Sequence, residues 1–191
     1  MIDTKFLDQL KQNYRTNESA RRQIISAANN ILFEAKKSIF ALQREDFKIA
    51  AQKLNEIEKA LVNLATRFGQ ERLQREGAYK AAAEEYLEGK TFYSIIKKKK
   101  ITPSPGLNLD YEAYLGGVCD LIGELVRYAT NQAAKGKFNE VAKIKKTAAD
   151  IMAQLIDFDL TGYLRTKYDQ ARGHLRKLEQ MSYEIKLKTK K

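Results

Sequence analysis

Two short acidic stretches of the chain contain the residues best suited to chemistry. The first holds Glu85 and Glu88, and the second holds Asp120 and Glu124. Because an α-helix advances about 100° per residue, the first pair would lie roughly 60° apart around a helix and the second pair roughly 40° apart. Each pair therefore presents two carboxylates on one helix face, as a two-carboxylate claw.

The stretch between the claws contains both prolines of the chain, Pro103 and Pro105, and predicts a connector between two helices. If these helices form an antiparallel hairpin, a rise of about 1.5 Å per residue brings the claws to similar levels, facing each other. Each like-charge contact at about 5 Å would then cost roughly 3 kcal/mol at an effective dielectric constant near 20. A divalent cation would relieve this repulsion, and Mg²⁺ or Mn²⁺ suits ligands that are all oxygen atoms.

We therefore predict a metal site with four ligands, Glu85, Glu88, Asp120 and Glu124, which are also the candidate catalytic residues if the bound ion serves in a reaction. Metal ions held by carboxylates hydrolyse phosphodiesters by activating a bound water, without a histidine base. The open alternative is two groups of surface acids without metal, since acids at these spacings are common on helices. Apolar neighbours of the second claw, such as Leu121 and Ile122, argue against that alternative.

Composition narrows the class of partner. The 191 residues carry a net charge of +11, which predicts attraction to a polyanion, either nucleic acid or an acidic membrane surface. One cysteine, Cys119, excludes an intramolecular disulfide and a cysteine-based zinc site. The only histidine, His174, is interpreted as a surface or core residue. The chain has no apolar run near 18 residues and begins with charged residues, so we expect a soluble cytoplasmic protein without a membrane partner.

Several cations are candidates for contacts with the phosphates of a polyanion. Arg127 follows Asp120 by seven residues and lies about 20° from it around a helix, so it could reach the same cavity or pair with Glu124. The other candidates could equally be ordinary cations on helix surfaces: Arg21, Arg22, Arg72, Arg75 and Lys80.

Apolar residues recur every three or four positions along most of the chain, which predicts an all-α, single-domain antiparallel bundle over residues 1–191. We expect six helices, one of which could be split to give seven. Their approximate ranges are up to 44, 46–68, 70–96, 111–135, 138–158 and 161–187, before a lysine-rich tail at about 186–191. Asn17 and Asp110 are expected N-caps, Gly69 a break or bend, and Gly136 a helix end.

Three segments of the chain resemble the translin/Trax family. They are Ile31–Arg44, the Glu85-Tyr-Leu-Glu88 element and Tyr114–Arg127, and the similarity extends from about Tyr14 to Leu187. The resemblance implies a bundle of seven helices that assembles into a closed octameric barrel and handles RNA inside it.

The two branches of that family differ at the claws. Trax is similar to this chain in having an acid at all four claw positions, where it forms a metal-dependent ribonuclease site. Translin is similar at Glu88 and Glu124 but has an apolar residue in place of Glu85 and a serine in place of Asp120. The Gly-Val-Cys before Asp120 resembles translin. The mixture suggests a prokaryotic or archaeal relative that assembles with itself, and a Mg²⁺- or Mn²⁺-dependent endoribonuclease acting on single-stranded or structured RNA.

Three alternatives remain open. A MazG-like nucleoside triphosphate pyrophosphohydrolase would use the Glu84-Glu85-x-x-Glu88 element, although Asp120-x-x-x-Glu124 inverts the order of that family's second acidic pair. A translin-like protein would bind single-stranded RNA or DNA without cutting it. A scaffold would only complete a barrel around another subunit. A ferritin-like di-iron protein is disfavoured because no glutamate stands three residues before His174.

Overall fold

The computed structural model describes residues 3–104 and 106–189, and within these ranges the regular structure is entirely helical. Seven α-helices follow one another, with a 3₁₀ turn, Ile156–Phe158, after the sixth. Their bounds are α1 Thr4–Gln43, α2 Phe47–Phe68, α3 Gln70–Leu73, α4 Gly77–Ile96, α5 Tyr111–Ala134, α6 Phe138–Leu155 and α7 Gly162–Thr189. The all-α prediction and the count of six to seven helices are confirmed.

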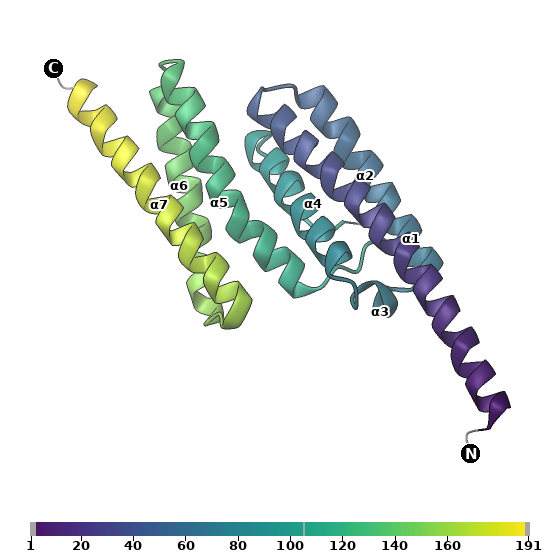
Figure 1. Cartoon of the computed structure of the whole chain (residues 1–191). Helices are drawn as coiled ribbons and strands as arrows, with labels where there is room; N and C mark the ends of the chain where they lie inside the picture. The colour runs from purple at the N-terminus through teal and green to yellow at the C-terminus, as the bar shows by residue number, and fades with distance from the viewer. Residues whose placement is uncertain (1–2, 105, 190–191) are drawn as a thin grey trace.

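The helices form two packed groups that meet along α4 and α5 (Figure 1). Helices α1, α2 and α4 enclose one apolar core, which includes Ile24, Leu61 and Tyr86. Helices α5, α6 and α7 enclose most of a second core, which includes Leu125 and Leu178 and continues onto the end of α1. The beginning of α1 projects beyond the bundle (Figure 1). None of the helices in the described ranges has the length and apolar character needed to cross a membrane.

Helices α4 and α5 run in the same direction, so the expected antiparallel hairpin is wrong. Lys80 pairs with Glu112 near the start of both helices, with 3.2 Å between Nζ and Oε2. Further along, the rings of Phe92 and Tyr128 pack edge to face with their centroids 5.7 Å apart. The connector 97–110 therefore leads back along the molecule instead of making a tight turn (Figure 1).

Buried polar contacts hold this return connector against the bundle. The Tyr86 hydroxyl lies 3.0 Å from Ser104 Oγ and donates to Glu58 over 2.6 Å, while Lys90 also donates to both Ser104 and Glu58. At the end of the connector, Asp110 accepts a hydrogen bond of 2.8 Å from the Ala113 amide. Asp110 is therefore the N-cap of α5, as predicted.

Two other helix boundaries differ from the prediction. The segment 70–96 is split, because the chain leaves the helix after Leu73 and resumes at Gly77. Glycine is a weak helix former, and Glu76 before it is extended, with its carboxylate held by Arg72 at 2.6 Å. Asn17 is inside α1, not at its start, and Asp3 is the N-cap. Gly69 and Gly136 interrupt the helices with positive φ angles of 77° and 73°.

Candidate carboxylate site between α4, α5 and α7

Two consecutive glycines bring α5 close to α4 at the level of the claws. A Cβ atom at Gly117 would lie 2.8 Å from the Glu84 carbonyl oxygen and 3.0 Å from the Glu88 amide nitrogen. A Cβ atom at Gly116 would lie 2.0 Å from the Glu84 carboxylate. At Gly117 the added atom would meet backbone, so only glycine fits there without a shift of the helices, whereas at Gly116 it would meet the end of the flexible Glu84 side chain.

The parallel arrangement of the helices still brings the two predicted claws together. We call Glu85 and Glu88 of α4 with Asp120 and Glu124 of α5 the carboxylate cluster. Burial, together with the charges of the other three carboxylates, raises the pKa of Glu88 to about 9, although the charge of Lys167 opposes this rise. Burial likewise raises the pKa of Glu85; the charge of Lys36 opposes this rise, while the charges of Asp120 and Glu124 add to it.

Glu88 is the most buried member of the cluster. Its exposed fraction is 7%, and no side chain in the described part of the protein donates a hydrogen bond to its carboxylate. A largely buried acid without a donor is costly, since little water reaches its charge and no partner compensates it. Glu88 is therefore held neutral in the absence of a cation, and the cluster provides a reason for a cation to bind.

Helix α7 adds a lysine that the sequence did not point to. Lys167 Nζ contacts Asp120 Oδ2 and lies 2.8 Å from Glu84 Oε1, and the Tyr163 hydroxyl donates to the same Glu84 oxygen over 2.8 Å. Burial alone would lower the pKa of Lys167, but its hydrogen bonds to Asp120 and Glu84 raise that pKa above its ordinary value. Glu84, which its helical position would turn towards solvent, has a side chain only 14% exposed.

A buried glutamine orients the fourth carboxylate. Gln43 Nε2 donates to Glu124 Oε2 over 2.7 Å and to the Glu124 carbonyl oxygen over 3.0 Å. Asn131 donates to Gln43 Oε1 over 3.2 Å and so fixes which way the amide points. Arg127 lies 3.7 Å from Glu124 Oε2, with its guanidinium 4.6 Å from the centre of the Phe40 ring. Gln43 could have been found from the sequence, because it is a polar residue at a buried position of α1.

The only histidine also lies beside the cluster. His174 packs against Gly123 of α5, where an added Cβ atom would lie 3.3 Å from Nε2. Burial lowers the pKa of His174, and Lys177 lowers it further, whereas Asp120 and Glu124 act in the opposite direction. His174 and Lys167 are seven residues apart on α7 and therefore share one face of that helix.

The cluster opens into a groove with a volume of about 510 Å³. Glu85 and Asp120 line this groove together with three lysines, one from each of three helices: Lys36, Lys80 and Lys167. Three further acids, Glu84, Asp110 and Glu112, also line the groove, so its acids outnumber its lysines, and a phosphate-containing ligand would need a bound cation as well as these lysines.

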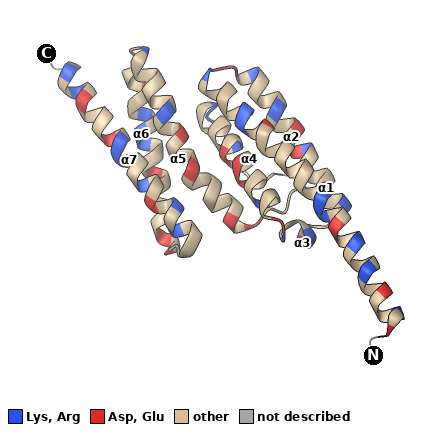
Figure 2. Cartoon of the chain, in the orientation of Figure 1, with Lys and Arg blue, Asp and Glu red and all other residues tan. Residues whose placement is uncertain are grey.

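Most of the other predicted RNA contacts lie outside this groove. Arg72 and Arg21 both reach Glu76, at 2.6 and 3.5 Å, and Arg75 pairs with Glu71 on α3. Arg22 is exposed on α1. Figure 2 shows Lys and Arg residues, in blue, along the lower part of α1 and around α3. Of the six cations predicted to contact RNA, Lys80 lines the groove and Arg127 adjoins the cluster.

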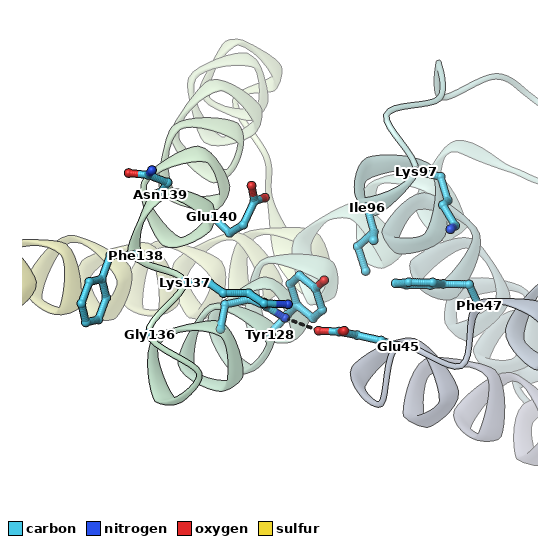
Figure 3. A pocket seen from close by; sticks show the side chains of 11 residues that line it. Glu45, Phe47, Ile96, Lys97, Tyr128, Gly136, Lys137, Phe138, Asn139 and Glu140 are labelled. Carbon is cyan, nitrogen blue, oxygen red and sulfur yellow. Dashed lines mark hydrogen bonds between the residues drawn. The ribbon is translucent and has the colours of Figure 1, made fainter.

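A second cavity lies elsewhere and has a volume of about 710 Å³. Figure 3 shows its lining, which comes from the turn between α1 and α2, the end of α4 and the turn between α5 and α6. Phe47, Tyr128 and Phe138 line it, while Gln132 donates to Glu45 over 2.6 Å. Its acids are paired with neighbouring donors, so this cavity lacks an uncompensated carboxylate such as that of Glu88.

The carboxylate cluster fits a hard divalent cation in its chemistry, because its donors are all carboxylate oxygens. As the side chains stand, no group of three or more His, Cys, Asp or Glu residues within 3–104 and 106–189 is placed to hold a metal ion. Lys167 engages Asp120, and Gln43 engages Glu124. Closure of the cluster around a cation therefore requires side-chain rotation and release of Asp120 from Lys167.

Comparison with known proteins agrees with this fold. The Translin family model matches residues 8–189, nearly the whole chain. The chain belongs to the Translin family. An uncharacterised protein of Methanocaldococcus jannaschii is 30% identical over 174 residues, which is 86% of this chain and 76% of that protein.

Solved structures of Translin-like fold superpose over almost the full length. The crystal structure of apo-NeC3PO has a TM-score of 0.81 and 26% identity, covering 96% of this chain and 97% of that one. AfC3PO has a TM-score of 0.84 and 22% identity, covering 95% and 97%. A structure of AfC3PO with duplex RNA has a TM-score of 0.83 and 22% identity, covering 95% and 96%. The resemblance to the Translin family predicted from three segments is thus confirmed.

Proposed function

We propose that this Translin-family protein is an endoribonuclease that binds RNA and hydrolyses its phosphodiester bonds with a divalent ion, Mg²⁺ or Mn²⁺. The observation that supports this most strongly is Glu88, a buried acid without a hydrogen-bond donor among three further carboxylates. Such a group is stable as an anion only when a cation joins it. The four ligands of the ion would be Glu85, Glu88, Asp120 and Glu124.

Charge and family membership support RNA as the substrate. The net charge of +11 attracts polyanions, and lysines from three helices border the groove. A protein of the same fold has been solved with duplex RNA. We infer that both structured and single-stranded RNA can enter, and single-stranded DNA is an additional ligand to test.

Individual residues of the chain would have separate roles in this reaction. Lys36 and Lys80 attract the phosphates of RNA to the groove, where Glu85 and Asp120 face the same space. Gln43 keeps Glu124 in one orientation, which is the usual task of a residue behind a metal ligand. When bound, the divalent ion would supply an activated water and neutralise charge on the phosphate. No histidine base is required for that chemistry.

Cleavage of a labelled RNA oligonucleotide tests this function. Purified protein is incubated with Mg²⁺ or EDTA, as wild type, Asp120→Asn, Glu124→Gln and the control Glu179→Gln, which removes an exposed acid of α7. We expect the two cluster variants to lose cleavage by about 100-fold or more, while binding of RNA in EDTA is unchanged or stronger. Cleavage by Asp120→Asn at the wild-type rate would overturn the assignment.

The second candidate function is RNA binding without cleavage. The contacts of Lys167 with Asp120 and of Gln43 with Glu124 favour it, because they keep these two carboxylates in orientations that do not form a metal site. This function predicts RNA that remains intact after long incubation with Mg²⁺, together with binding that survives EDTA. A panel of nucleoside triphosphates in the same assay tests the MazG-like reaction, which the family match does not favour.

We further propose that copies of this chain assemble into a closed barrel of eight subunits. The projecting part of α1 carries Phe6, Leu10 and Tyr14 within roughly 80° of one another, and all three are exposed. An isolated helical segment with an exposed apolar stripe gains stability when it packs against another chain.

A further inference from the structure

Lys167 is the only residue of the described protein whose side chain joins the carboxylate cluster by an ion pair from a third helix. Its Nζ contacts Asp120 Oδ2 and lies 2.8 Å from Glu84 Oε1, and its side chain is only 18% exposed. The lysine comes from α7, whereas both acids come from the adjoining helices α4 and α5. Its positive charge therefore occupies the region where a divalent ion would be most stable.

We propose that Lys167 is an internal counter-ion of the carboxylate cluster and that it competes with the divalent ion for Asp120. This inference rests on the metal site proposed above and adds a positioning residue that controls when that site can fill. In the free protein, Lys167 holds Asp120 in an orientation that leaves the cluster open. When an ion binds, Asp120 turns away from the ammonium group and towards the other carboxylates.

The second partner of Lys167 makes this exchange possible. After Asp120 leaves, the ammonium group remains paired with Glu84, which is itself fixed by the hydroxyl of Tyr163 at 2.8 Å. The lysine thus stays charged and hydrogen-bonded, so its release from Asp120 does not leave an unpaired buried cation. Its position in the groove wall keeps it next to any phosphate that follows the ion into the site.

The competition has a direct consequence for affinity. A fixed positive charge a few ångströms from a divalent ion opposes binding of that ion. The ammonium group of Lys167 also contacts one carboxylate oxygen of Asp120, which is then not free to bind the ion. Lys167→Met removes the charge while keeping an unbranched side chain. We therefore expect Lys167→Met to bind Mn²⁺ at least about tenfold more tightly than the wild type.

Mn²⁺ binding followed by electron paramagnetic resonance, without RNA, tests this expectation. Lys53→Met is a matched control, because Lys53 is also a partly buried lysine paired with an acid, Glu34, but lies on α2 outside the groove. Lys53→Met should bind Mn²⁺ like the wild type, and Lys167→Arg, which keeps the charge, should not bind it more tightly than the wild type.

The outcomes separate this inference from the proposed function. Equal or weaker Mn²⁺ binding by Lys167→Met would overturn the competition while leaving the metal site in place. Failure of both the wild type and Lys167→Met to bind Mn²⁺ would overturn the metal site itself and the competition with it.

A measurement on the wild type alone covers the case in which Lys167→Met does not fold. Lysine side chains are labelled with an amine-reactive reagent and the labelled positions are quantified by mass spectrometry, with and without Mg²⁺. We expect Mg²⁺ to increase the labelling rate of Lys167 several-fold, because one of its two carboxylate partners is removed, and to leave that of Lys53 unchanged. An unchanged rate at Lys167, in protein that binds the ion, would contradict the proposal.

Discussion

Replacing Glu88 with glutamine should stabilise the protein at neutral and alkaline pH. Glu88 is buried, receives no hydrogen bond from a side chain of the described residues and has a pKa raised from 4.5 to about 9 by burial and by its carboxylate neighbours. In the unfolded chain the same group ionises near its ordinary value. Ionisation therefore favours the unfolded state over the whole interval between these two pKa values.

The sign and size of the effect follow from linkage between protonation and folding. Because the folded pKa lies above the unfolded one, the stability associated with Glu88 is fully present below pH 4.5 and is lost as the pH rises towards 9. The limiting slope is about 1.4 kcal/mol per pH unit for one group. Between about pH 5 and pH 8 the wild type should thus lose up to about 4 kcal/mol relative to Glu88→Gln.

Urea unfolding of both proteins across this pH range measures the difference in the free energy of unfolding. Titrating groups far from the cluster contribute equally to both proteins, so the difference reports Glu88 together with its coupling to the other three carboxylates. We expect the difference to grow with pH in favour of Glu88→Gln, and to shrink when excess Mg²⁺ is added, because an ion that binds the folded wild type stabilises it. A difference that stays flat with pH would refute the reasoning that Glu88 is an uncompensated buried acid.

Two further predictions concern the packing of α5 and the assembly. Gly117→Ala should cost about 1–3 kcal/mol of unfolding free energy, because the new methyl group meets backbone atoms of α4. The control Gly173→Ala places a methyl group with no atom within 4 Å and should be neutral or slightly stabilising. Equal shifts of the melting temperature for the two variants would show that α4 and α5 do not approach closely at Gly117. Light scattering after gel filtration should give a particle of eight 21.9 kDa chains, about 175 kDa, and a 21.9 kDa particle at all concentrations would exclude self-assembly.

Local patterns in the sequence were sufficient for most of the helices and for the pairing of acids within each claw, whereas the meeting of the two claws was argued from an antiparallel hairpin that the structure contradicts. Asp110 was recognisable as a cap by its position before an apolar repeat, and the claws by their spacing. The direction of α5 was not predictable in this way, since a long connector permits either direction. It is set by contacts distant in sequence, such as Ser104 with Tyr86.

The remaining parts of the site depend on tertiary packing in the same way. Nothing local in α7 indicates that Lys167 meets Asp120 or that His174 packs against Gly123. Gly116 and Gly117 were a usable signal, because adjacent glycines inside an apolar helix often mark a close helix contact. The break before Gly77 also had a local signal, which the alanine-rich sequence that follows it obscured.

Crystals of the protein soaked in Mn²⁺ would test the central claim most directly, by anomalous scattering from the ion. We predict a manganese peak between α4 and α5, bound by carboxylates of Glu85, Glu88, Asp120 and Glu124, with Lys167 released from Asp120 and still paired with Glu84. A soaked crystal with no anomalous peak in the cluster, and with Lys167 unmoved on Asp120, would contradict the account.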